Sequence, residues 1–167
     1  MKFGKRLLAA VLVSVLALTM LTACGNAPSN VDLSKAKEIL NPINARRTTA
    51  GMQSLTLSEE ASLLLGNYAK AAAAYHANST TDAKAALNAA IENAKTEVRK
   101  IKINGKPVCV KYNYTFYGSS SADDMKKALE RETDWFVQEK DKACNYVAIA
   151  TYGSGSASAT VVITLYV

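Results

Sequence analysis

The strongest constraint on the fold is the order in which two hydrophobic periodicities occur along the chain. In the first part, apolar residues recur at steps of three and four, which is the spacing of one face of a helix. Later they alternate every second residue, as in a strand with one buried face. The helical patterns cover residues 32–51, 58–75, 82–101 and 121–136, and the strand patterns cover 108–116, 146–152 and 160–167. Helices gathered first and strands last predict an α+β fold with an antiparallel sheet.

Local signals set the limits of the helices. Pro42 lies inside the first helical pattern and is expected to bend or break it. Gly51 ends that segment. Ser58 and Ser121 are each followed by two acidic residues, as expected of residues that cap a helix N-terminus.

The strand at 108–116 has the clearest alternation in the chain. Five apolar or aromatic residues take every second position, namely Val108, Val110, Tyr112, Tyr114 and Phe116. Cys109, Lys111, Asn113 and Thr115 take the positions between them. This pattern predicts one strand with a single buried face.

The first residues of the chain have the three parts of a secretory signal peptide. A basic start with Lys2, Lys5 and Arg6 precedes an uncharged apolar run from 7 to 20. The stretch Leu-Thr-Ala-Cys at 21–24 resembles the lipobox of bacterial lipoproteins, which implies removal of residues 1–23 and a diacylglycerol on the thiol of Cys24. An ordinary secretory signal that contains a cysteine is the alternative. Residues 24–31 then form a short polar tether before a domain at 32–167.

Charge and length limit the remaining possibilities. Without the leader, the formal charge of +6 falls to about +3, because the leader holds three basic and no acidic residues. The nearest approach to a basic cluster is Arg99, Lys100, Lys102 and Lys106, which is interpreted as a solvated helix end, and no nucleic-acid partner is expected. About 144 residues remain, enough for one domain with a core of its own.

Two cysteines remain after Cys24. Cys109 lies on the first predicted strand and Cys144 precedes the second, so they are expected to be cross-strand neighbours that could form a disulfide. Two independent buried thiols are the alternative.

The segment that ends the first helical pattern resembles the CAP superfamily of cysteine-rich secretory proteins, antigen 5 and plant pathogenesis-related proteins. The family's opening has Asn, Arg, Gly and Leu at fixed steps, which Asn44, Arg47, Gly51 and Leu55 match. Trp135 on a late helix and the closing pair of strands follow the family's order. The resemblance implies an α-β-α sandwich, with a three-stranded antiparallel sheet between about four helices and a cleft at one side. From their own chemistry, Arg47 could cap the first helix and Gly51 could take a left-handed turn.

The family's cleft often holds two histidines that bind a metal ion, and here the chain departs from it. His76 is the sole histidine, at about the position of the first family histidine, and Phe136 to Glu139 replace the segment that would carry the second. No bound metal or other cofactor is therefore expected. His76 stays a candidate for the cleft, although a lone histidine at a helix end is more often a cap or a surface group.

No motif of a known enzyme class is present. The preferred hypothesis is a non-enzymatic binding or interaction module, held outside the cytoplasm on the bacterial membrane by the lipid on Cys24. Its partner would be a small apolar ligand or an envelope protein. Tyr112, Tyr114 and Tyr117 could contact such a ligand, although alternating aromatic residues on a strand are more often part of the core. The alternatives are a cell-envelope hydrolase that uses His76 and a structural envelope lipoprotein with no ligand.

Overall fold

The computed structural model describes residues 30–167, so the predicted signal peptide, Cys24 and most of the tether lie outside the described residues. Five α-helices are described: α2 (Leu33–Thr49), α3 (Glu59–Leu63), α4 (Gly66–Ala77), α5 (Thr81–Val98) and α6 (Ala122–Arg131). The strands are β1 (Thr56–Leu57), β2 (Lys102–Ile103), β3 (Lys106–Pro107), β4 (Cys109–Tyr117), β5 (Tyr146–Tyr152) and β6 (Ala159–Tyr166). Two short 3-10 helices, η1 (Glu139–Asp141) and η2 (Gly155–Ala157), precede β5 and β6. The predicted α+β class is confirmed.

The main sheet has four strands in the order β1-β5-β6-β4. Strand β6 lies between β5 and β4 and pairs antiparallel with both. These three strands are the ones that the sequence predicted. The expectation of a three-stranded sheet is wrong by one strand, because β1 adds to the edge of β5 in parallel. Two residues are too few to give an alternating pattern, which is why the sequence did not reveal β1. Strands β2 and β3 form a separate antiparallel pair.

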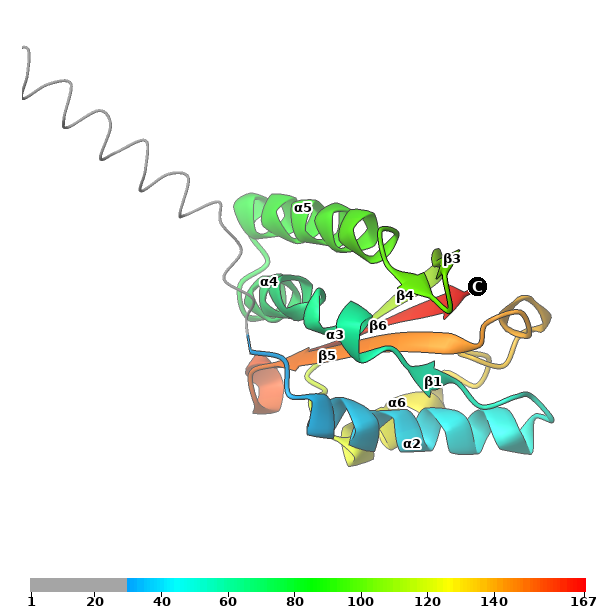
Figure 1. The fold of residues 1–167 in the computed structure, drawn as a ribbon. Helices are drawn as coiled ribbons and strands as arrows, with labels where there is room; N and C mark the ends of the chain where they lie inside the picture. Colours follow the sequence, from blue (N-terminus) through cyan, green and yellow to red (C-terminus); the bar gives the residue numbers. More distant parts are fainter. Residues whose placement is uncertain (1–29) are drawn as a thin grey trace, which may run out of the picture.

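Helices cover both faces of the sheet, in three layers (Figure 1). On one face, helices α3, α4 and α5 form a core with Ala148, Val161 and Ile163 of the sheet. On the other face, helices α2 and α6 form a second core with Val147, Ile149 and Val162. Successive residues of β5 and β6 therefore enter opposite cores, so these strands read as nearly continuous apolar runs.

Strand β4 does not have the single buried face that its alternation predicts. Its register with β6 shifts between Val110 and Tyr112, as at a β-bulge. Val110 packs against the core under α4 and α5, whereas Tyr114 and Phe116 pack in the core under α2 and α6. An extra residue moves every later side chain to the opposite face, so one apparent alternation supplies two cores.

Three helix predictions need correction. Pro42 does not break the first helix, because α2 continues through it as far as Thr49. Pro42 removes one backbone donor, but burial of Ile39, Leu40 and Ile43 on the same helix offsets that loss. The pattern at 58–75 is not one helix, because α3 ends at Leu63 and α4 begins at Gly66. The pattern at 121–136 is helical only as far as Arg131, so Trp135 lies after α6 and not on a helix as expected.

The predicted caps are confirmed: the side chain of Ser58 accepts a hydrogen bond from the backbone N–H of Ala61, and that of Ser121 from Asp124. None of the helices within residues 30–167 is both long enough and apolar enough to cross a bilayer.

Candidate functional site: a cleft at the carboxyl end of strand β4

The four residues of the predicted motif all take part in fixing the path of the backbone. The side-chain amide of Asn44 donates to the carbonyl of Leu55 at 2.9 Å and accepts from its N–H at 2.8 Å, so it pairs with Leu55 as a neighbouring strand would. Gly51 turns the chain between them with φ +70°, as predicted. Asn44 thereby places the residues that enter β1. The motif carries structure, as its own chemistry suggested.

Arg47 does not cap its own helix, contrary to expectation. It is fully buried, and its guanidinium donates to the carbonyl oxygens of Gln53, Phe136, Asp141 and Cys144 at 2.8 to 3.3 Å. Burial lowers the pKa of Arg47, while the nearby Cys144 and Asp141 act to raise it. One cation therefore holds together the loop after α2 and the long connection from α6 to β5.

That connection carries the predicted Trp135, which lies just after α6. Phe136 follows with an unusual positive φ of 66° and is fully buried, held by its carbonyl bond to Arg47. Trp135 packs edge-on against Phe116 of β4, with ring centroids 4.9 Å apart. Arg47 thus fixes the aromatic side chain that forms one wall of a cleft.

The cleft lies between the carboxyl end of β4 and helix α6 and has a volume of about 340 Å³. Phe116, Tyr117 and Trp135 supply aromatic surface, and the turn Gly118–Ser119 supplies polar surface. The α6 side carries charges of both signs, from Asp124, Lys127, Arg131 and Glu132. A volume of this size suits a small molecule.

Ser119 is the most informative residue of the cleft. It lines the cleft, is 4% exposed, and its hydroxyl has no hydrogen-bond partner. The carbonyl of the same residue accepts from Thr160 at 2.8 Å, so the backbone is firmly placed. A buried hydroxyl without a partner costs free energy unless a ligand or water satisfies it.

Asp124 is already engaged by the turn that leads into α6. Its carboxylate accepts from the hydroxyl of Ser121 at 2.7 Å and from the N–H of Ser120 at 3.1 Å. These bonds, the one from the Ser121 side chain first, lower the pKa of Asp124. The carboxylate therefore stays ionised and holds the turn, with Lys127 and Arg131 nearby on the same helix.

His76, the predicted cleft residue, borders the cleft without lining it. Its ring stacks on Tyr117 with centroids 5.0 Å apart, and its Nε2 lies close to Gly118. Tyr75 also contacts Tyr117. His76 therefore supports the aromatic wall from behind.

The three tyrosines that could have contacted a ligand or entered the core have three different roles. Tyr117 lines the cleft. Tyr114 packs against Phe136, with centroids 4.5 Å apart, and burial raises its pKa. The ring of Tyr112 lies under the ammonium group of Lys140, at 4.5 Å.

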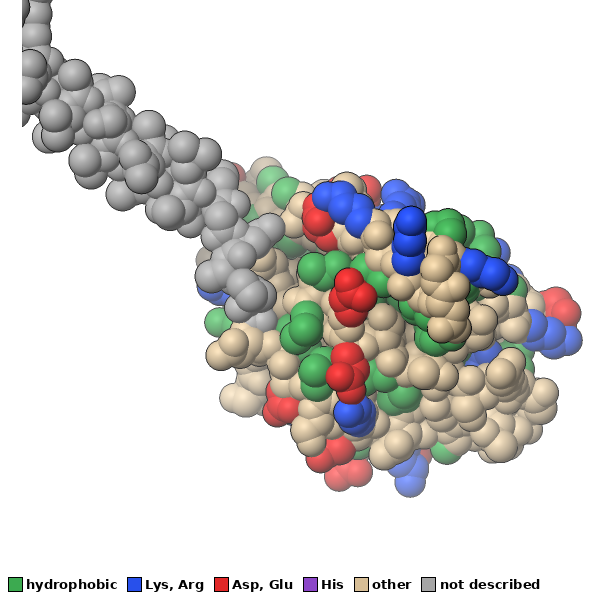
Figure 2. All heavy atoms as spheres, in the orientation of Figure 1, with side chains coloured by type: hydrophobic (Ala, Val, Ile, Leu, Met, Phe, Trp, Pro, Cys, Tyr) green, Lys and Arg blue, Asp and Glu red, His purple; other side chains and the backbone are tan. Residues whose placement is uncertain are grey.

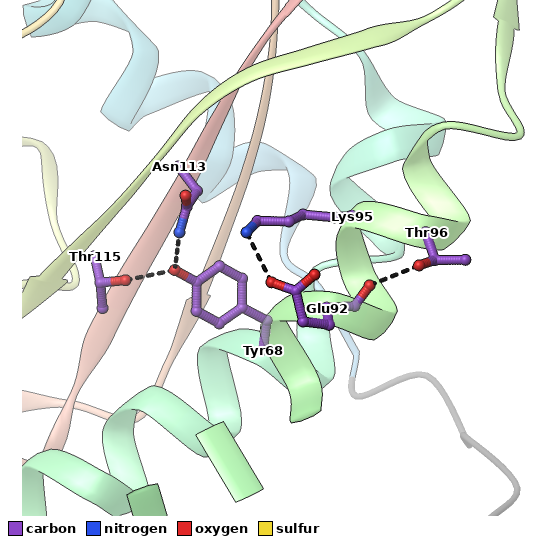
Figure 3. A network of polar contacts seen from close by, with 6 residues as sticks. All are labelled: Tyr68, Glu92, Lys95, Thr96, Asn113 and Thr115. Atoms are coloured by element: carbon purple, nitrogen blue, oxygen red, sulfur yellow. Dashed lines mark hydrogen bonds and ion pairs between the residues drawn. The ribbon is translucent and has the colours of Figure 1, made fainter. Parts of the chain in front are cut away.

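A buried tyrosine attaches helix α4 to the strand that forms the cleft. The hydroxyl of Tyr68 contacts Thr115 at 2.6 Å and accepts from Asn113 at 3.2 Å, as Figure 3 shows. Thr115 is itself a cleft residue. The pair Glu92 and Lys95 in the same view lies on α5 and has no drawn link to Tyr68. Tyr68 thus fixes the position of α4, and hence of His76, relative to the cleft.

The two cysteines are not neighbours. Strand β6 lies between β4, which begins at Cys109, and β5, which follows Cys144. The structure has both thiols free, Cys109 exposed and Cys144 buried. The expected cross-strand contact is wrong because β4 and β5, although successive strands of the main sheet in sequence, are not adjacent in it.

The structure places charge and possible metal ligands as follows. Within residues 30–167, no group of three or more His, Cys, Asp or Glu side chains is arranged to hold a metal ion. Arg99, Lys100, Lys102 and Lys106 are all exposed, at the end of α5 and on the β2–β3 pair. Figure 2 shows acidic and basic side chains interspersed over the face in view.

Comparison of the sequence with protein-family models and with curated proteins gives no match. The geometry of the cleft is therefore the main evidence on function. The sequence singled out Tyr117 as a possible ligand contact, His76 as a cleft candidate and Trp135 only as part of the family resemblance, and it gave no sign of Ser119, Lys127 or Arg131. A serine run after a strand gives no sign of which hydroxyl is left without a partner.

Proposed function

We propose that this chain is a lipid-anchored binding module outside the cytoplasm, with a CAP-like domain that binds a small, partly apolar ligand in the β4–α6 cleft without transforming it. The observation that carries the proposal is the Ser119 hydroxyl, which is buried, without a partner, and beside an aromatic wall. Aromatic side chains favour a flat apolar group, and the hydroxyl can donate to an acceptor on the same ligand. Lys127 and Arg131 favour an acceptor that is anionic.

The CAP-like part of the proposal is supported by the three layers of the fold and by the backbone contacts that the motif residues make. Asn44, Arg47, Gly51 and Leu55 form one connected set of backbone contacts, which gives a physical reason for their spacing. Catalysis is not part of the proposal, because His76 does not line the cleft.

The single tryptophan gives a direct test of the cleft. Trp135 lines it, so a bound chromophore should quench Trp135 emission by energy transfer. We choose 1-anilinonaphthalene-8-sulfonate as the probe, because its rings suit the aromatic wall and its sulfonate can accept from Ser119, Lys127 and Arg131. Saturable quenching at one probe per chain is the expected result.

A variant with a filled cleft is compared with the wild type. Ala128 lines the cleft on α6, and Ala128→Phe should occupy the space and abolish saturable binding. The matched control is Ala86→Phe, the same change at an exposed position of α5, which should leave binding unaltered. Equal probe affinity in both variants would show that the probe binds elsewhere and would remove the support for the cleft.

The anchor is tested separately, on the full chain in bacterial cells. Labelled fatty acid should enter the wild type and not Cys24→Ser, since the thiol is the proposed site of attachment. Equal labelling of both chains would contradict the anchor and leave the cleft experiment unaffected.

A further inference from the structure

Tyr117 of β4, Ala159 of β6 and Tyr152 of β5 form a row across one end of the sheet. Tyr117 pairs with Ala159, and Ala159 pairs on its other side with Tyr152. Residues that pair across strands share a face, so the two phenol rings flank Ala159 on the same side of the sheet. Tyr117 is 41% and Tyr152 40% exposed, which is high for such large side chains. Tyr75 and His76 adjoin Tyr117 from the end of α4.

The segments that form this row carry no formal charge. The three segments that meet at this end are 71–81, 117–122 and 152–159, and they contain no Asp, Glu, Lys or Arg. The first charges appear at Asp82 and Asp123, where helices α5 and α6 begin. The segments are rich in serine, glycine and tyrosine. We call this surface, made of residues 75–81, 117–121 and 152–158, the tyrosine end.

The described chain begins at the same end of the molecule. Figure 1 shows the first described residues at the end where β5 finishes and β6 starts, opposite the C-terminus. Val31 packs against the core that also contains Ala159. Cys24 lies six residues before Asn30 in the sequence, and six residues can span at most about 20 Å. A lipid on Cys24 would therefore hold this end, and not the opposite end, close to a bilayer.

We infer that the tyrosine end is a membrane-contact surface, which rests on the polar interface of the bilayer that holds the lipid of Cys24. The inference rests on the proposed lipid anchor but is independent of the ligand in the cleft. Tyrosine is enriched at the interface between lipid and water, because its ring is apolar and its hydroxyl can reach headgroups and water. The three segments of the tyrosine end carry no formal charge, so their contact with the bilayer avoids the cost of removing charged groups from water, while the nearest charges, Asp32, Asp82 and Asp123, lie at the starts of helices α2, α5 and α6.

The contact also fixes the orientation of the cleft. Tyr117, Gly118 and Ser119 belong both to the tyrosine end and to the lining of the cleft. Burial, followed by the neighbouring Tyr68 and Tyr75, raises the pKa of Tyr117, so its phenol is uncharged at neutral pH. The cleft would open beside the bilayer, where a partly apolar ligand is most concentrated.

The strand order provides a matched pair of probes. Tyr152 and Tyr166 have nearly equal exposure, 40% and 37%, but lie at opposite ends of the main sheet. The length of β6, about 25 Å, separates the two ends. Each is replaced by tryptophan in a Trp135→Phe background, in the full lipidated chain. The chains are placed in phosphatidylcholine vesicles with acyl chains brominated near the headgroup, since bromine quenches tryptophan on contact.

The expected result is loss of fluorescence for Tyr152→Trp and no loss for Tyr166→Trp, relative to vesicles without bromine. Equal loss at both positions, greater loss at 166, or no loss at either position in chains that float with the vesicles would overturn the inference. Failure of the chains to float would instead contradict the lipid anchor. Hydrogen exchange of the wild type on the same vesicles avoids any substitution: segment 152–158 should gain protection and the end of β6 should not.

Discussion

Replacing Arg47 by methionine is the strongest test of how the fold is held together. Methionine has a similar volume but no donors, so the carbonyls of Gln53, Phe136, Asp141 and Cys144 would lose their shared partner. Because all of this lies in a fully buried site, water cannot replace the lost bonds without opening the structure.

The magnitude follows from the two shortest bonds, to Gln53 and Phe136, each 2.8 Å long. Bonds to a charged donor contribute about 1.5 to 3 kcal/mol each. Removing a charge that is costly to bury offsets part of the loss, while the buried carboxylate of Asp141 loses the attraction of Arg47. We expect a net loss of about 3 to 5 kcal/mol in the free energy of unfolding, a large share of the 5 to 15 kcal/mol typical of a domain.

The assay is urea and thermal unfolding at neutral pH, followed by circular dichroism. A loss of that size should lower the melting temperature by roughly 6 to 20 °C. Lys37→Met is the control: it removes a cation from the same helix, where Lys37 forms an exposed pair with Glu59, and should cost at most about 1 kcal/mol. If Arg47→Met were no more costly than Lys37→Met, the view of Arg47 as the residue that holds the two loops would be refuted.

Three further predictions concern charge, thiols and backbone. The pKa of Asp124 is lowered in the folded protein, so its stabilising effect is full above the unfolded pKa of about 4 and declines as pH falls through the lower folded pKa. The loss of stability in Asp124→Asn should therefore be greatest at pH 7 and should shrink as the pH is lowered below about 4; a difference that does not change with pH would contradict this. In a Cys24→Ser chain a thiol reagent should modify exposed Cys109 quickly and buried Cys144, whose pKa burial raises, only on unfolding; equal rates would be inconsistent with the burial of Cys144. Gly153→Ala should cost more stability than Gly51→Ala, because both positions have positive φ but only at Gly153 would the new Cβ meet a carbonyl, at 2.3 Å; equal melting temperatures would contradict that geometry.

The sequence predicted those parts of the fold that depend on local pattern. The caps at Ser58 and Ser121 and the three long strands follow from rules that operate within a few residues. The two-residue β1 could not be predicted, because it exists only through its pairing with β5. The bulge in β4 was hidden for a related reason: apolar residues continue at every second position while the core they enter changes.

The candidate site was predicted only in part, because it depends on a hydroxyl group that has no hydrogen-bond partner in the folded protein. Trp135, His76 and the tyrosines are conspicuous as residue types, and the structure does bring Tyr117 and Trp135 to one cleft. Ser119 is one of three successive serines, and only the fold shows that its hydroxyl lacks a partner. Arg47 was expected at a helix end, but its acceptors lie 6 to 97 residues away along the chain.

The central claim, that the β4–α6 cleft is a binding site, is tested most directly by measuring stability and probe affinity together in Ser119→Ala. A binding hydroxyl that has no partner in the free protein should be removable without loss of melting temperature, yet its removal should weaken binding of the sulfonate probe by about 5- to 10-fold. Ser158→Ala is the matched control, because this buried hydroxyl already donates to the carbonyl of Gly155 at 2.6 Å, so its removal should lower stability and leave the affinity unchanged. The opposite result for Ser119→Ala, lower stability with unchanged affinity, would show that the hydroxyl serves the fold and would contradict the claim.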